Sequence, residues 1–199
     1  MGLRDILTGR HEVKGPAPDR LFAISTAYIT LQSEHQIEPA GKAAIVFQSL
    51  ATSEFEETLR EMEQLVTATG AESGTTVATD DDEFGYRWMV LSNPGEASIE
   101  DLAVGINAVS GSIETAGHAD RLLCAVFAFA DKSSSRSASS PRVYFIYNYK
   151  RGYWYPFVPG QGPQERSTER ELQLKAQLAS DLPIEPEIAR WFPLWGIPI

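Results

Sequence analysis

Apolar residues recur at every third or fourth position in three stretches of the chain, a spacing that predicts amphipathic helices. The clearest stretch begins at Ser53, which forms a capping box with Glu56, and ends at Gly70, a residue able to adopt a left-handed conformation. Two more helices, each beginning with a similar capping pair, are predicted over residues 98–117 and 168–178. The remaining apolar runs lie between these helices and are candidates for strands.

Short apolar or alternating runs predict β-strands. The predicted strands are residues 27–32, 43–48, 84–91, 122–130 and the two arms of a hairpin within 143–158. We expect the first two strands to form an antiparallel pair, because Pro39 and Gly41 lie in the short connection between them. In the hairpin, Gly152 is expected to supply the positive φ angle of the turn, and Pro156 restricts its arm to an edge position or to the end of the strand.

An acidic turn, residues 80–83, precedes the strand at 84–91. The turn lacks the alternating acids and closing glutamate of a calcium-binding loop, so it is interpreted as a solvated turn. Within the strand, a period of two places Phe84 on the same face as Trp88, with Leu91 on the opposite face. Both faces of the sheet are therefore expected to be covered by the end of this strand.

Strands and helices alternate without a strict βαβ pattern, which predicts an α+β fold with a mostly antiparallel sheet and helices packed on it. We find no internal repeat and no second apolar core, so residues 20–199 are predicted to form a single domain. Residues 1–19 are interpreted as an N-terminal appendage, because a glycine and two prolines within 15–18 make a stiff connection. Residues 181–199 form a C-terminal tail rich in aromatic side chains.

Charge and composition exclude several functional classes. The chain has 199 residues and a net charge of −10, which argues against a nucleic-acid binder, because phosphate contacts need a dense basic surface. Its single cysteine, Cys124, excludes an internal disulfide framework and a cysteine-rich zinc site. No apolar run approaches the ~18 residues of a membrane span, and no signal peptide is recognised. The sequence thus predicts a soluble cytoplasmic protein.

The charges are also unevenly distributed along the chain. Residues 53–83 contain ten acidic residues and one basic residue, whereas residues 121–151 contain six basic residues and one acidic residue. The two segments either face each other in the fold or form separate acidic and basic faces. Opposed patches of this kind can steer a partner toward the protein.

No group of residues has the spacing of a catalytic or metal site. The three histidines are scattered, and Cys124 lies inside an apolar strand, where a small buried side chain is the usual case. His118 follows a glycine that ends a predicted helix, a position at which histidine is structurally expected. We therefore assign no catalytic residue, no metal ligand and no cofactor.

Two aromatic clusters are candidates for contact with a partner protein or a lipid surface. They are Lys150, Arg151, Tyr153 and Trp154 at the hairpin tip, and Trp191, Phe192 and Trp195 in the tail. Basic residues among aromatic ones can meet anionic headgroups, but a half-buried aromatic sheet face has the same composition. The tail either packs back over the domain or exposes an aromatic anchor.

Five segments carry a recognisable set of aromatic and structural motifs. They are VYFIYNYKRGYWYPFV at 143–158, DLPIEPEIARWFPLWG at 181–196, FGYRW at 84–88, MGLRD at 1–5 and LLCAVF at 122–127. Together they resemble the PspA-associated protein PspAB family, and the likeness runs nearly from end to end. The resemblance implies a cytoplasmic accessory of the phage-shock-protein system, which responds to envelope stress.

In that system, PspA-type proteins are coiled-coil scaffolds that assemble on stressed membranes. The resemblance therefore implies a non-enzymatic adaptor that binds a PspA-like coiled-coil protein, at the inner face of the membrane. The order of elements after residue 53 is also similar to the type III secretion chaperone-like fold, which favours a protein-binding module. Two alternatives stay open: a binder of anionic membranes through residues 1–10 and the Lys150–Arg151 tip, or an uncharacterised enzyme that uses Cys124 or His118.

Overall fold

One antiparallel sheet organises the computed structural model, which describes residues 18–70, 74–82, 84–93, 98–133 and 142–199. In these residues the sheet has six strands, and every neighbouring pair is antiparallel. Across the sheet the strands are β2 (Thr76–Asp81), β3 (Tyr86–Ser92), β1 (Ile37–Gln48), β4 (Leu122–Asp131), β5 (Arg142–Asn148) and β6 (Tyr153–Phe157). The predicted α+β fold with a mostly antiparallel sheet is confirmed.

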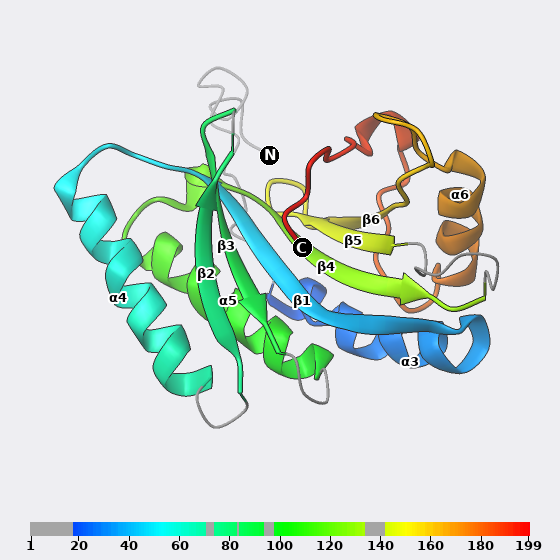
Figure 1. Cartoon of the computed structure of the whole chain (residues 1–199), viewed down its shortest axis with the longest axis horizontal. Coiled ribbons are helices and arrows are strands. Elements are labelled where there is room, and N and C mark those ends of the chain that lie inside the picture. The colour runs from blue at the N-terminus through cyan, green and yellow to red at the C-terminus, as the bar shows by residue number, and fades with distance from the viewer. Residues whose placement is uncertain (1–17, 71–73, 83, 94–97, 134–141) are drawn as a thin grey trace, which may run out of the picture.

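Helices cover one face of this sheet. They are α3 (Ala23–His35), α4 (Ser53–Gly70) and α5 (Ile99–Thr115), and α3 and α5 lie behind the strands in Figure 1. A short helix, α2 (Pro18–Leu21), precedes α3, and α6 (Thr168–Gln177) packs against β6 at the edge of the sheet. Two single 3-10 turns, η1 (Ala119–Arg121) and η2 (Ile188–Arg190), complete the described elements.

The two faces of the sheet carry two separate apolar clusters. On the helix side, Phe47, Phe127 and Phe145 pack against the helices. On the other side, the strands pack against the C-terminal tail, which runs in red in front of the sheet in Figure 1. Trp88 and Leu91 point to opposite faces and both are buried, as the alternation predicts.

Local sequence signals explain α5 well. The Ser98 side chain accepts a hydrogen bond from the backbone N–H of Asp101 at 3.1 Å, which confirms the predicted cap. Gly105 allows the helix to approach the sheet closely, since a Cβ atom there would lie 2.4 Å from Leu91 Cδ2. The helix ends before Gly117, which has a φ angle of +82°.

The N-cap positions of the other two helices each lie one residue before the predicted one. In α4 the cap is Thr52, whose hydroxyl accepts a hydrogen bond from the N–H of Phe55 at 3.3 Å, and Gly70 is still helical rather than left-handed. In α6 the N-cap position is Ser167 instead of Thr168, and its side chain makes no capping hydrogen bond. The helices themselves are confirmed.

The predicted strand at 27–32 is wrong, because these residues belong to α3. β-branched residues made the run resemble a strand, but its buried side chains are Ile24, Ala27 and Leu31, a helical spacing that packs on the sheet. Pro39 and Gly41 consequently do not join two strands. They lie within β1, where the pairing with β4 shifts in register.

The hairpin formed by β5 and β6 is confirmed, with a φ angle of +66° at Gly152 and with Pro156 on the outermost strand. β2 is a strand that the sequence does not reveal, because nearly all of its side chains are exposed and no apolar alternation marks it. Most of the predicted appendage, residues 1–17, lies outside the described residues, and α2 already begins at Pro18.

Candidate interaction surfaces

One of the four residues predicted at the hairpin tip, Trp154, is part of the core. Trp154 is fully buried, and its indole N–H donates a hydrogen bond to the carbonyl oxygen of Arg20 at 2.7 Å. Its ring centroid lies 5.6 Å from that of Phe127 and 5.2 Å from that of Tyr147. The expectation that Trp154 contacts a partner is therefore corrected, because period two along β6 turns this side chain toward the helix layer.

The other residues of this tip are held by neighbouring segments, with one exception. The Arg151 guanidinium forms an ion pair with the buried carboxylate of Glu185 in the tail. The Arg20 guanidinium lies 5.0 Å from the centre of the half-buried Tyr153 ring. Lys150 is exposed, and its role in binding stays a prediction, as do those of Arg151 and Tyr153.

The Arg151–Glu185 pair fixes the charge of Glu185 despite its burial. Burial raises the pKa of this carboxyl group, but hydrogen bonds from Arg151 and from the backbone N–H of Glu187 outweigh that effect. The pKa of Glu185 is therefore below its ordinary value, and the group is ionised at neutral pH.

The tail packs back over the sheet, which decides between the two interpretations of its aromatic residues. Trp191 is buried against Tyr155, and its indole N–H donates to the carbonyl oxygen of Glu185 at 3.0 Å. Trp195 is half-buried, with its ring edge-on to Phe157. Among the three predicted contact residues of the tail, only Phe192 is mostly exposed, at 60%.

A buried ion pair ties the tail to α6 and β6. The Glu171 carboxylate is almost completely buried and accepts hydrogen bonds from the Val158 N–H at 2.9 Å and from Arg166 at 2.9 Å. Arg166 also donates to the carbonyl oxygen of Trp191 at 2.8 Å. The Glu171 carboxylate thus binds both Val158, directly after β6, and Arg166, which in turn binds the tail. The position of the tail therefore depends on this carboxylate.

Cys124 and His118 lie apart in the fold. Cys124 is buried on the tail side of the sheet, and burial raises the pKa of its thiol to about 12, so it is protonated at neutral pH. The His118 ring lies edge-on to Phe55, which belongs to the helix side. The structure therefore does not bring these two residues together.

The structure gives no sign of a metal centre in the part of the chain that it describes. There, no three histidine, cysteine or acidic side chains are grouped so that they could hold a metal ion. In the same residues no helix has the length and apolar composition to cross a membrane.

The acidic and basic segments form separate regions rather than opposed ones. Acidic segment 53–83 builds α4 and β2, at one edge of the sheet, whereas basic segment 121–151 builds β4 and β5 and leads to the other edge. Within the acidic region, the Arg87 guanidinium binds Asp81 at 2.7 Å and Glu56 at 2.9 Å. This arginine lowers the pKa of Asp81 and links the β2–β3 hairpin to α4.

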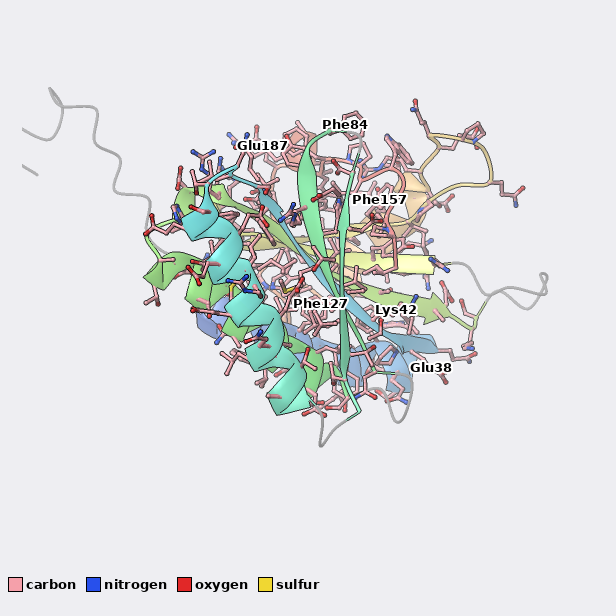
Figure 2. The ribbon with its side chains drawn as sticks, turned by 60° about the vertical axis from the view of Figure 1, so that its left-hand side comes forward. Glu38, Lys42, Phe84, Phe127, Phe157 and Glu187 are labelled. Carbon is pink, nitrogen blue, oxygen red and sulfur yellow. The ribbon has the colours of Figure 1, made fainter. Side chains whose placement is uncertain are left out.

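The tip of the β2–β3 hairpin exposes an aromatic residue that sequence reasoning placed on a buried face. Phe84 precedes β3 and lies in the turn, where its side chain is 71% exposed. Figure 2 shows it at the end of the hairpin, at the margin of the molecule. The carboxylate of Asp82 accepts hydrogen bonds from the N–H groups of Phe84 and Tyr86, both at 2.9 Å, and from the Trp88 indole at 3.0 Å.

The chain matches the model of a known protein family. The family model described as PspAB, PspA associated protein B, matches residues 1–199. No curated protein and no solved structure matches the chain. The likeness to the type III secretion chaperone-like fold accordingly stays a prediction.

Proposed function

Since the chain belongs to the PspAB family, we propose that it is a non-enzymatic accessory of a PspA-like membrane-stress scaffold and acts by binding that scaffold directly. The observation that carries this proposal is the match of the family model to residues 1–199, under a description that names association with PspA. Direct binding is the simplest physical form of such an association. The proposed location is the cytoplasm, at the inner face of the membrane where the scaffold assembles.

The placement of the reactive side chains favours a binding protein over an enzyme. The Cys124 thiol is buried and protonated, and His118 packs against Phe55 instead of facing the thiol. A nucleophile that is both neutral and far from a base lacks the activation that covalent catalysis needs. The exposed side chains of the described residues are instead mostly charged or polar, with a few large apolar ones among them. Protein interfaces use both polar and apolar side chains.

The test is binding between the purified full-length chain and the purified PspA protein of the same organism. Size-exclusion chromatography with light scattering, followed by calorimetry, is expected to show a complex with a fixed stoichiometry. An unrelated coiled-coil protein serves as the control for non-specific association. Absence of a complex with both the free and the assembled form of PspA would overturn the proposal.

Two further experiments test the alternatives. Co-sedimentation of the purified chain with anionic vesicles in the absence of PspA would favour a direct membrane binder. Loss of protection against envelope stress in cells that carry Cys124→Ala or His118→Ala, with PspA binding intact, would favour the enzymatic alternative.

A further inference from the structure

The β2–β3 hairpin ends in an exposed aromatic side chain. Phe84 is the most exposed of the large hydrophobic side chains in the described residues, at 71%. Neighbouring Tyr86 is also exposed. A single exposed apolar residue needs no explanation by itself, but the backbone of Phe84 is also held by a specific hydrogen bond.

A single carboxylate, that of Asp82, binds the described residues on the far side of the turn that carries Phe84. Asp82 accepts hydrogen bonds from two backbone N–H groups of the turn and from the Trp88 indole. Its own N–H donates to the carbonyl oxygen of Tyr86 at 2.9 Å, and Gly85 supplies a φ angle of +80°. The backbone at Phe84 is thus held before binding, which reduces the backbone entropy lost when the residue binds a partner.

The base of the hairpin is held as well. Arg87 contacts Asp81 with two nitrogen atoms, at 2.7 Å and 3.0 Å, and reaches Glu56 on α4 with a third. Next to this cluster, the Thr79 hydroxyl donates a hydrogen bond to Glu63 of α4. These contacts attach the base of the hairpin to α4.

The surface around the tip is acidic. Asp80 and Asp81 on β2 and three glutamates of α4, Glu56, Glu57 and Glu63, outnumber the two basic residues, Arg87 and Arg60. An anionic bilayer would be repelled by this surface, whereas a protein with basic side chains around an apolar pocket would be attracted to it. The charge pattern therefore selects a protein partner.

We propose that the β2–β3 tip is a preformed anchor whose Phe84 ring enters an apolar pocket bordered by lysine or arginine side chains on the partner protein. This inference rests on the proposed function, because the partner is then the PspA-like scaffold. Asp82 is a positioning residue in this arrangement, and the surrounding carboxylates guide the approach of the basic surface.

The experiment measures the affinity of full-length variants for purified PspA by calorimetry. Phe84→Ala is expected to weaken binding about 10-fold or more, the usual effect of truncating an aromatic anchor, with an unchanged melting temperature. Phe192→Ala is the matched comparison for the competing surface in the tail: it removes the same ring from a site with 60% exposure near β6, whereas Phe84 lies between β2 and β3 at the other edge of the sheet. If the anchor is Phe84, the Phe192 variant is expected to bind as the wild type does.

Further variants separate the anchor from its surroundings. Asp82→Ala retains the Phe84 ring but releases the turn, and it is expected to weaken binding, whereas Phe84→Trp should preserve most of the affinity. Asp80→Lys is expected to slow association and to reduce its dependence on salt.

The outcomes show whether the anchor proposal fails alone or together with the proposed function. Wild-type affinity in Phe84→Ala, with a measurable PspA complex, overturns the anchor and leaves the proposed function intact. Loss of affinity in Phe192→Ala alone would assign the interface to the tail instead. Absence of any wild-type complex overturns both, and sedimentation with anionic vesicles that depends on Phe84 would replace the protein partner with a membrane.

Discussion

The two hairpins at opposite edges of the sheet use aromatic side chains in contrasting ways. The β5–β6 hairpin is dense in aromatic residues, and it buries Trp154 among the helices and packs Tyr155 on the tail. In the β2–β3 hairpin, Trp88 is buried but Phe84 projects from the tip. The edge strand of the first hairpin is covered by α6 and by a bridge to Ile184, whereas β2 pairs only with β3 in the described residues.

The contrast shows that aromatic density is a poor guide to an interface. A strand with consecutive aromatic residues is buried on both faces when helices cover one side and a tail covers the other, as in β6. Exposure follows instead from position in a turn, as at Phe84. In the basic tip Trp154 is therefore part of the core, whereas the turn after β2 carries the candidate anchor.

The largest expected difference between the hairpins concerns stability. Trp154→Ala should lower the free energy of unfolding by about 3–5 kcal/mol, because it leaves a cavity beside Phe127 and an unpaired carbonyl group on Arg20. Phe84→Ala should change it by about 0.5 kcal/mol or less, since the ring is already in water. Urea unfolding of both variants measures the contrast, which equal losses would contradict.

A second prediction concerns the ties of the β5–β6 edge. Glu171→Ala leaves Arg166 without its carboxylate and Val158 without its acceptor, and it should cost about 3 kcal/mol of unfolding free energy. Glu57→Ala is the control, because its ion pair with Arg60 is exposed and is worth about 1 kcal/mol at most. If urea unfolding gives Glu171→Ala and Glu57→Ala similar losses of unfolding free energy, the tail does not depend on the buried pair.

Sequence reasoning succeeded where the signal is local. Helices α4 and α5 follow from apolar spacing and capping residues, and the β5–β6 hairpin from a glycine turn between apolar arms. It failed at α3, where packing on the sheet overrides the β-branched residues, and at β2, whose exposed side chains leave no alternation to detect.

The candidate anchor was hidden by the same limitation of local patterns. Phe84 fits the period-two alternation of β3, so the pattern assigned it to the buried face with Trp88. The signal that could have corrected this is the pair Asp82 and Gly85, since an aspartate that accepts from the N–H two residues later is typical of a turn. The burial of Trp191 depends on contacts between distant segments, which no local pattern records.

A third prediction tests the turn itself. Asp82→Ala removes three acceptor contacts, including that of the Trp88 indole, and should cost about 1–2 kcal/mol of unfolding free energy. Asp80→Ala, an exposed acid on the same hairpin, should stay within about 0.5 kcal/mol of the wild type. If urea unfolding gives both variants the same stability, the carboxylate of Asp82 does not hold the turn.

The smallest expected effect compares the two hairpins through their response to acid. Hydrogen bonds from Arg87 lower the pKa of Asp81. Burial raises the pKa of Glu185, but hydrogen bonds from Arg151 and from the backbone outweigh this effect, so the pKa of Glu185 is also lowered. A carboxyl group whose pKa is depressed by folding adds stability above its unfolded-state pKa, and this stability is lost as the pH falls through the folded-state value.

Urea unfolding between about pH 3 and pH 7 should therefore show wild-type stability that falls as acid is added. Glu185→Gln should reduce this slope, because the pair with Arg151 is shielded by the tail. Asp81→Asn should reduce it less, since Asp81 is largely exposed and its attraction to Arg87 is screened by water. The reverse order would mean that the β2–β3 hairpin, rather than the β5–β6 hairpin, carries the more strongly coupled carboxylate.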